Sequence, residues 1–261
     1  MGRTLILSDI HFCKRGSTVK SVDQLRSLWQ GFDALILNGD TSELHSASHA
    51  EASKQAAADV KVATKRDGVE LTFICGNHDP TISDIEHIWF HNTKTLVFHG
   101  HAPIKGVAPW SWRCKYIAKN NESQIKETGD GFEEQLNATR TASTFAATGA
   151  FKQHRPTAPH MLMLSVPAVY KVIRCWWQYP SIVANWIHLY APSAKFVITG
   201  HTHHAGIWKR QGITVINTGC FGFPSHPRAV VIDSTTITVH KITKHNGVYE
   251  LGRVCESWSA L

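Results

Sequence analysis

The sequence predicts a layered α/β fold, and two observations predict it. Apolar runs of strand length alternate with segments of helical spacing over the first third of the 261 residues. Five such runs also end in Gly, Asp, Asn or His, at residues 5–11, 35–40, 71–78, 96–101 and 196–203. Ligands of layered α/β proteins bind beyond the carboxyl ends of the strands, so the sequence predicts a site there.

The elements follow in chain order. After the first strand, residues 19–29 have apolar side chains at helical spacing, and residues 32–40 form the second strand. Residues 46–66 are rich in Ala, Lys and Glu, which predicts a surface helix, and residues 71–75 form the third strand. We expect the later strands at residues 96–98, 196–199, 214–217, 229–232 and 236–242.

Residues 106–194 interrupt this regularity and predict a helical, cap-like insertion within a single domain of residues 1–261. Two apolar segments in it are bounded by Pro167, Pro180 and Pro192. One helical face of the first segment is apolar, and we expect this face to pack onto the core. Alternatively, the helix covers a binding site or contacts a lipid surface. This face consists of Val169, Val172, Ile173 and Trp176.

The charge distribution favours an anionic partner. The formal net charge is +7, and no Asp or Glu occurs from Gln135 to Ile232. Phosphorylated small molecules, nucleic acid and a membrane surface all fit such a charge. The six cysteines show no Cys-x-x-Cys pairing, and the first apolar run is too short for a signal peptide. We therefore expect a cytoplasmic protein, with peripheral contact at the inner face of the membrane as an extension.

The strand ends carry a set of oxygen and nitrogen donors with no thiolate among them. Such donors suit Mn, Fe, Zn or Mg better than a structural zinc site, and we expect Mn first. A donor set of this size is too large for one ion and fits two ions that share a carboxylate, as in enzymes that hydrolyse phosphoesters. The candidate donors are Asp9, His11, Asp40, Asn77, His78, His99, His201 and His203.

These residues fall into five blocks that resemble the motifs of the calcineurin-like metallophosphoesterases. The blocks are Asp9 with His11, Gly39 with Asp40, Gly76 to Asp79, His99 with Gly100, and Gly200 to His203. The resemblance implies a four-layer αββα sandwich of two mixed β-sheets flanked by helices, with the metals at the strand ends.

The resemblance also implies roles for these residues. One metal would take Asp9, His11, Asp40 and His203, and the other would take Asp40, Asn77, His99 and His201, with Asp40 bridging the two. His78 would stabilise the transition state or protonate the leaving oxygen, and Asp79 would orient it. Two alternatives stay open: His101 in place of His99 as a ligand, and Asp79 as a cap of the turn before Pro80.

The resemblance therefore implies an enzyme that hydrolyses a phosphoester or pyrophosphate bond through a metal-bridging hydroxide. The place of the insertion is similar to that in UDP-2,3-diacylglucosamine hydrolases, which act on a lipid precursor. Those enzymes typically carry Arg where this chain has His78. The alternatives are a metal-dependent nuclease and a non-catalytic scaffold. Basic residues of the insertion are the candidate substrate-binding groups: Arg113, Arg155, Lys171 and Arg174.

Overall fold

The computed structural model describes residues 2–259 except 15, 45–48, 148–157 and 224–225. The first half of the chain forms β1 (Thr4–Leu7), η1 (Val22–Gln24), α1 (Arg26–Trp29), β2 (Ala34–Asn38), α2 (Ala50–Arg66), β3 (Glu70–Ile74), β4 (His87–Phe90) and β5 (Thr95–Phe98). Three helices follow: α3 (Cys114–Thr128), α4 (Phe132–Ala147) and α5 (Ala158–Tyr190). The remaining strands are β6 (Phe196–Thr199), β7 (Gly206–Arg210), β8 (Ile213–Asn217), β9 (Arg228–Ile232), β10 (Thr236–His245) and β11 (Val248–Ser259).

The strands form two mixed sheets. The six-stranded sheet has the order β11-β10-β9-β1-β2-β3, in which β1, β2 and β3 run parallel and β9, β10 and β11 pair antiparallel. The five-stranded sheet has the order β4-β5-β6-β8-β7, with a parallel centre and antiparallel edges. Strands β1, β2 and β3 of one sheet and β5 and β6 of the other precede the loops that carry the predicted site.

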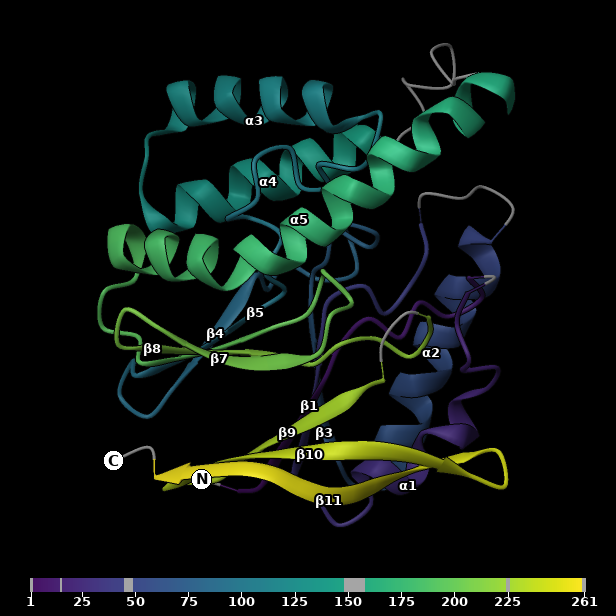
Figure 1. The fold of residues 1–261 in the computed structure, drawn as a ribbon. Coiled ribbons are helices and arrows are strands. Elements are labelled where there is room, and N and C mark those ends of the chain that lie inside the picture. Colours follow the sequence, from purple (N-terminus) through teal and green to yellow (C-terminus); the bar gives the residue numbers. More distant parts are fainter. Residues whose placement is uncertain (1, 15, 45–48, 148–157, 224–225, 260–261) are drawn as a thin grey trace.

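Alternation of side chains along the strands builds the layers. In β1, Leu5 and Leu7 pack with α1 and α2, whereas Ile6 packs with Val97 and Ile198 of the other sheet. The five-stranded sheet is covered on its outer face by α5 and α4, and α3 lies above α4 (Figure 1). The result is helix, sheet, sheet, helix, which confirms the predicted four-layer αββα fold.

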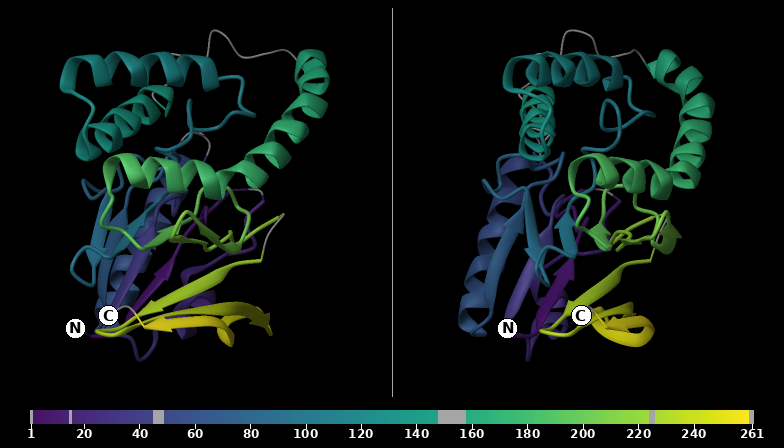
Figure 2. Two further views of the ribbon diagram at one scale, coloured as in Figure 1. Left: turned by 60° about the vertical axis from the view of Figure 1, so that its left-hand side comes forward. Right: turned by 90° about the vertical axis from the view of Figure 1, so that its left-hand side faces the viewer.

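Some elements differ from the prediction. The segment at residues 19–29 forms only η1 and α1, while β4, β7 and β11 were not predicted. The prolines at 167 and 180 lie inside one continuous helix, α5. The carboxyl-terminal part of this helix runs along the sheet, and its amino-terminal part extends away from the sheet (Figure 2). Each proline removes a backbone hydrogen bond, which allows a long helix to bend.

The apolar face predicted in α5 packs against the rest of the protein only in part: Val172 and Trp176 are half-buried. Val169 and Ile173 are 58% and 56% exposed, because this part of α5 leaves the sheet. Only farther along does the helix bury its apolar residues, among them Tyr179, Val183 and Ile187. No helix in the described part of the chain is both long enough and apolar enough to cross a membrane.

Candidate metal centre

The predicted ligands lie on loops that directly follow strands, and the two sheets bring these loops together. Asp9 and His11 follow β1, Asp40 follows β2, and His99 follows β5. The loop after β6 adds His201 and His203. In the described residues, these side chains form two groups whose potential ligand atoms lie within 4.8 Å of one another. The first group is Asp9, His11, Asp40 and His203, and the second is Asp40, His99 and His201. Asp40 belongs to both.

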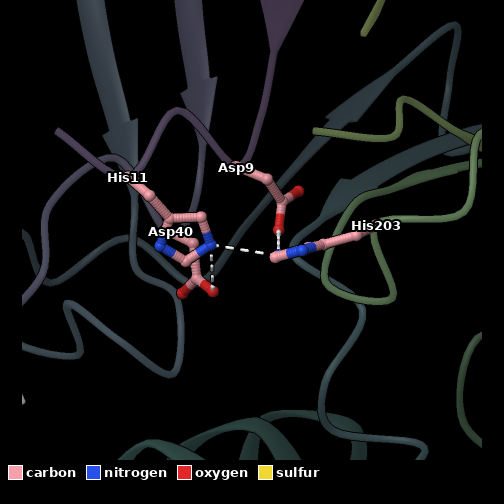
Figure 3. A group of neighbouring side chains, drawn as sticks. All are labelled: Asp9, His11, Asp40 and His203. Carbon is pink, nitrogen blue, oxygen red and sulfur yellow. Dashed lines mark hydrogen bonds and ion pairs between the residues drawn. The ribbon is translucent and has the colours of Figure 1, made fainter. Parts of the chain in front are cut away.

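The first group is compact and nearly buried (Figure 3). Nε2 of His11 lies 3.0 Å from Nε2 of His203 and 3.6 Å from Oδ2 of Asp40. Nε2 of His203 also lies 3.3 Å from Oδ1 of Asp9. Two imidazole nitrogens and two carboxylates therefore face a common point, which is the arrangement of a cation site.

In the second group each imidazole has one nitrogen held by a backbone carbonyl. Nδ1 of His99 lies 2.9 Å from the carbonyl oxygen of Asn38, and Nε2 of His201 lies 2.9 Å from that of Val107. The other nitrogen of His99 lies 3.4 Å from Oδ1 of Asp40. Such backbone contacts fix the ring orientation of a metal-binding histidine.

Several buried polar atoms near these loops have no hydrogen-bond partner, which bears on whether the site suits a cation. Nε2 of His99, Nδ1 of His201 and Oδ1 of Asn77 are buried and have no hydrogen-bond partner. A buried polar atom without a partner is costly, whereas all three atoms are good ligands for a divalent cation. The donor set of the two groups therefore fits two cations.

Burial and neighbouring charges set the protonation of the ligands. Burial lowers the pKa of His201 to about 3, and the charge of His99 adds to the effect. Burial opposes a charge on His99 too, but the carboxylate of Asp40 outweighs it and raises the pKa to about 9. The neighbouring imidazoles, His99 first, overcome the burial of Asp40 and hold its pKa well below the usual range. Asp40 is therefore an anionic ligand between the two groups.

The backbone at the ligands is strained. Asp9, His11, Asp40, His201 and His203 have φ angles of 52°, 50°, 51°, 67° and 58°. Residues other than glycine rarely adopt this left-handed backbone conformation. Such strain persists where the surrounding structure holds the backbone in place. The conformation turns the side chains of these loops toward the two groups.

Two glycines permit the close packing of the loops. A Cβ atom at Gly39, whose φ is +78°, would lie 2.3 Å from Nδ1 of His99. A Cβ atom at Gly200 would lie 2.1 Å from Oδ2 of Asp9. The Gly-Asp and Gly-His motifs therefore have a steric cause, since a larger residue would displace a ligand.

His78 contacts a residue that the sequence interpretation missed. Nδ1 of His78 lies 2.9 Å from Oε1 of Glu43, and both belong to a third group with His11. Burial disfavours ionised Glu43, but the hydrogen bond with His78 outweighs it and lowers the pKa of the carboxyl group. Glu43 follows the Gly-Asp motif by three residues, a spacing that carries no signal of its own. Its backbone N–H donates to Oγ of Ser53 on α2, at 2.7 Å.

Asp79 makes contacts other than those expected. Its carboxylate accepts hydrogen bonds from the backbone N–H groups of Asp40, Ser42 and Gly76, each at 2.9 Å. Asp79 thus joins the loops after β2 and β3, and the carboxylate that orients the His78 ring in the described contacts is that of Glu43. The alternative, a structural role for Asp79 near Pro80, agrees better with these contacts.

His101, the rival of His99, is buried with its ring 5.3 Å from that of His99. Neither of its nitrogens has a hydrogen-bond partner, yet it belongs to none of the three groups found in the described residues. It lies behind the ligands, 6.0 Å from the ring of His201.

The predicted substrate-binding residues are dispersed. Arg113 precedes α3 and donates to the backbone carbonyl of Ala146, at 3.2 Å. Lys171 and Arg174 are exposed on α5, and Arg174 bonds Gln178 of the same helix. Arg155 lies outside the described residues. The contacts named here join Arg113 to α4 and Arg174 to its own helix.

Comparison with known proteins adds independent information. The family model described as calcineurin-like phosphoesterase matches residues 2–205 of this chain. The match includes every predicted ligand and ends before β7. A comparison with curated protein sequences gives no match.

Several solved structures are similar in arrangement. A dimetal phosphatase from Danio rerio is 13% identical, with a TM-score of 0.49 over 99% of this chain and 98% of that chain. A predicted phosphoesterase from Streptococcus pneumoniae is 14% identical, with a TM-score of 0.41 over 99% and 97%. Vps29 of Entamoeba histolytica, complexed with zinc, is 14% identical, with a TM-score of 0.46 over 99% of each chain. Identities this low transfer no function.

Proposed function

The chain belongs to the calcineurin-like phosphoesterase family, and from this premise we propose that its strand-end ligands hold two divalent cations that serve phosphoester hydrolysis. One cation is assigned to Asp9, His11, Asp40 and His203, and the other to Asp40, Asn77, His99 and His201. The observation that carries the proposal is the membership of Asp40 in both ligand groups. A carboxylate shared by two ligand groups can bridge two cations about 4 Å apart.

The bound cations would polarise the phosphoryl group and lower the pKa of water. The chain's own residues prepare the site for this chemistry. Asp40 supplies negative charge between the two positions, and the carbonyl oxygens of Asn38 and Val107 hold two of the imidazoles in place. Nitrogen and oxygen donors accept Mn, Fe, Zn or Mg, and we propose Mn as the first choice.

His78 is proposed as the group that hydrogen-bonds the transferring phosphoryl group or donates a proton to the leaving oxygen. Its backbone N–H donates to Oδ1 of Asp40, at 2.8 Å, and its ring lies 4.9 Å from the ring of His11, which belongs to the first ligand group. The side chain is 27% exposed, which lets a substrate reach it. Oε1 of Glu43 lies 2.9 Å from Nδ1 and fixes the orientation of the ring.

Metal analysis combined with a rate measurement tests this function. The protein should hold two Mn²⁺ per chain and hydrolyse p-nitrophenyl phosphate or bis-p-nitrophenyl phosphate when Mn²⁺ is added. His78→Ala should keep the metals and lose about a hundredfold or more in kcat. His240→Ala is the matched control, because His240 lies on β10 and bonds only within the sheet. A His78 variant with the parent's rate would contradict the proposed role.

The finer substrate proposal is a lipid precursor of the UDP-2,3-diacylglucosamine type. It is supported by the three helices between β5 and β6, which we propose as an insertion at residues 106–194 within a single domain of residues 1–261. His78 in place of the arginine typical of those hydrolases counts against it. Relative rates on a monoester, a diester and the UDP-linked lipid decide the matter. Steeply salt-dependent binding of DNA, with cleavage, would favour the nuclease instead.

We also propose that α5 touches an anionic membrane at the inner face of the cell envelope. Five large apolar side chains are exposed between residues 166 and 177 of this helix, and Trp177 is 80% exposed. Lys171 and Arg174 lie among them, in a stretch without acidic residues, so acidic lipids would complement the charge. We name this set the α5 apolar face: Val166, Val169, Tyr170, Ile173 and Trp177.

Vesicle sedimentation tests the membrane proposal. The protein should sediment with vesicles of phosphatidylcholine and phosphatidylglycerol, and less with phosphatidylcholine alone. Ile173→Ser combined with Trp177→Ser should abolish sedimentation. Leu189→Ser is the control, since Leu189 is 74% exposed near the end of the same helix but outside the α5 apolar face. Equal binding of the parent and the double variant would refute the proposal.

A further inference from the structure

A pocket of about 650 Å³ adjoins the metal centre. His203, a member of the first ligand group, forms part of its wall. The opposite wall comes from β9 and β10, which contribute Arg228, Lys241 and Lys244. A molecule bound at His203 would therefore extend directly into this pocket.

The basic residues of the pocket lie side by side without a carboxylate. Arg228 and Lys241 are directly opposite each other in the antiparallel register of β9 and β10. Like charges in such positions repel, which destabilises the pair unless an anion lies between them. No carboxylate lines the pocket, and none of the ion pairs in the described part of the chain involves either residue.

The third basic residue is already held in place. Nζ of Lys244 donates to the carbonyl oxygen of Thr18, at 2.9 Å, and lies 4.8 Å from the ring centroid of Tyr249. Lys244 thus adds a fixed positive charge to the pocket, whereas Arg228 and Lys241 keep their donors for a ligand. Arg is well suited to phosphate because its guanidinium group can donate two parallel hydrogen bonds.

An aromatic wall completes the pocket. Trp176 of α5 stacks on His204, with ring centroids 4.9 Å apart and planes inclined by 28°. Its indole N–H donates to the carbonyl oxygen of Thr202, at 2.8 Å, which ties α5 to the loop that carries His203. A fixed indole beside cationic groups provides a surface for an organic part of a ligand.

We propose that this pocket binds a second phosphate group of the substrate, one that is linked to the phosphate being hydrolysed. The substrate class would then be organic compounds with two adjacent phosphates. The inference rests on the proposed function, since His203 connects the pocket to the reaction only if it binds a cation. It goes beyond the family match, because Arg228, Lys241 and Lys244 all lie after residue 205.

Calorimetric titration tests the pocket without relying on turnover. The Mn-loaded protein is titrated with AMP and with α,β-methylene-ADP, which carry one and two phosphorus groups on the same nucleoside. The parent should bind the second compound about tenfold more tightly or better, as expected for a charge-assisted hydrogen bond. Arg228→Gln and Lys241→Gln should each remove most of this preference, and Arg228→Lys should retain part of it.

Arg253→Gln is the matched control, because Arg253 is exposed on β11 and does not line the pocket. Hydrolysis of p-nitrophenyl phosphate, which has a single phosphate, should remain within about twofold of the parent in Arg253→Gln, since this residue lies away from the pocket. Thermal melting shows that each variant is folded.

The two proposals fail in different ways. Equal affinity of the parent for the two nucleotides, or a preference that survives in both glutamine variants, overturns the second-phosphate site even when p-nitrophenyl phosphate is hydrolysed. A preference that depends on Arg228 in a protein without hydrolytic activity supports the site and refutes the proposed function.

Discussion

Oε1 of Glu43 lies 2.9 Å from Nδ1 of His78, and the same carboxylate reaches Nζ of Lys14 through Oε2, at 3.4 Å. Glu43 is 7% exposed, so the contact is shielded from water on most sides. The ring of His78 is thereby fixed next to Asp40, to which its own backbone N–H donates. This pair makes Glu43 the positioning residue for the predicted catalytic histidine.

Glu43→Gln keeps the size of the side chain and removes its charge. We expect kcat to fall by about 10- to 100-fold, as is usual when the group that orients an active-site histidine is changed. Metal content should stay at the parent's level, which plasma emission spectroscopy measures. Glu51→Gln is the control, because Glu51 is exposed on α2 and pairs only with Lys54. A loss of metals in Glu43→Gln would mean that Glu43 is itself a ligand.

Asp40→Ala removes the only residue shared by the two ligand groups found in the described residues. We expect loss of both cations and of turnover, because the second group loses its one carboxylate and the first group keeps only Asp9 as a negatively charged ligand. Asp59→Ala, on the exposed side of α2, should behave like the parent. If metal analysis of purified Asp40→Ala found two cations, the shared-carboxylate model would be wrong.

Gly39→Ala and Gly31→Ala separate backbone strain from a steric clash. Both glycines have positive φ, +78° and +81°, so both substitutions carry a similar backbone cost of about 1–2 kcal/mol. Only at Gly39 does the new Cβ atom meet another group, Nδ1 of His99 at 2.3 Å, while nothing lies within 4 Å at Gly31.

The free energy of unfolding should therefore fall by about 1–3 kcal/mol more in Gly39→Ala than in Gly31→Ala. Denaturant titration measures both. Metal affinity should drop in Gly39→Ala alone, because the clash displaces His99. Equal losses in the two variants would show that the loop after β2 can yield without strain.

Stability should depend on pH through Asp67. Its carboxylate accepts hydrogen bonds from Arg26 and from the indole N–H of Trp29, and the hydrogen bond with Arg26 is the main cause that lowers the pKa of Asp67. A lowered pKa in the folded state means that the stabilisation is complete above the unfolded value of about 3.9 and is lost as pH falls through the folded value.

Asp67→Asn should accordingly lower the melting temperature at pH 7, and the difference from the parent should shrink as pH falls below about 4. Asp59→Asn is a suitable comparison, since Asp59 is exposed and contacts only Gln55 on the same helix. Differential scanning calorimetry at several pH values gives the result. A constant difference at all pH values would assign the effect to packing rather than to charge.

The sequence was sufficient for the strands that precede the site. Their apolar runs and the polar residues after them follow from burial in a sheet and from ligand chemistry, both of which are local signals. The edge strands β4, β7 and β11 were missed because they are partly exposed, and β7 and β11 also have no long apolar run. Such strands form because they pair with a neighbouring strand, and a single sequence does not reveal this pairing.

Two other differences have the same origin in tertiary structure. Glu43 reaches His78 only because Ser53 of α2 holds its loop, a contact that no motif reveals. The apolar stripe with Val169 and Ile173 has helical spacing, but spacing does not tell whether a second surface covers it. The pocket at Arg228 and Lys241 likewise depends on strand register.

The ligands span the chain from Asp9 to His203, with the three long helices between His99 and His201. During synthesis, a chain that has emerged from the ribosome only as far as α4 offers Asp9, His11 and Asp40 but neither histidine of the loop after β6. Nascent protein therefore cannot complete either ligand group until the loop after β6 has emerged, and incorporation of the metals becomes a late event of maturation.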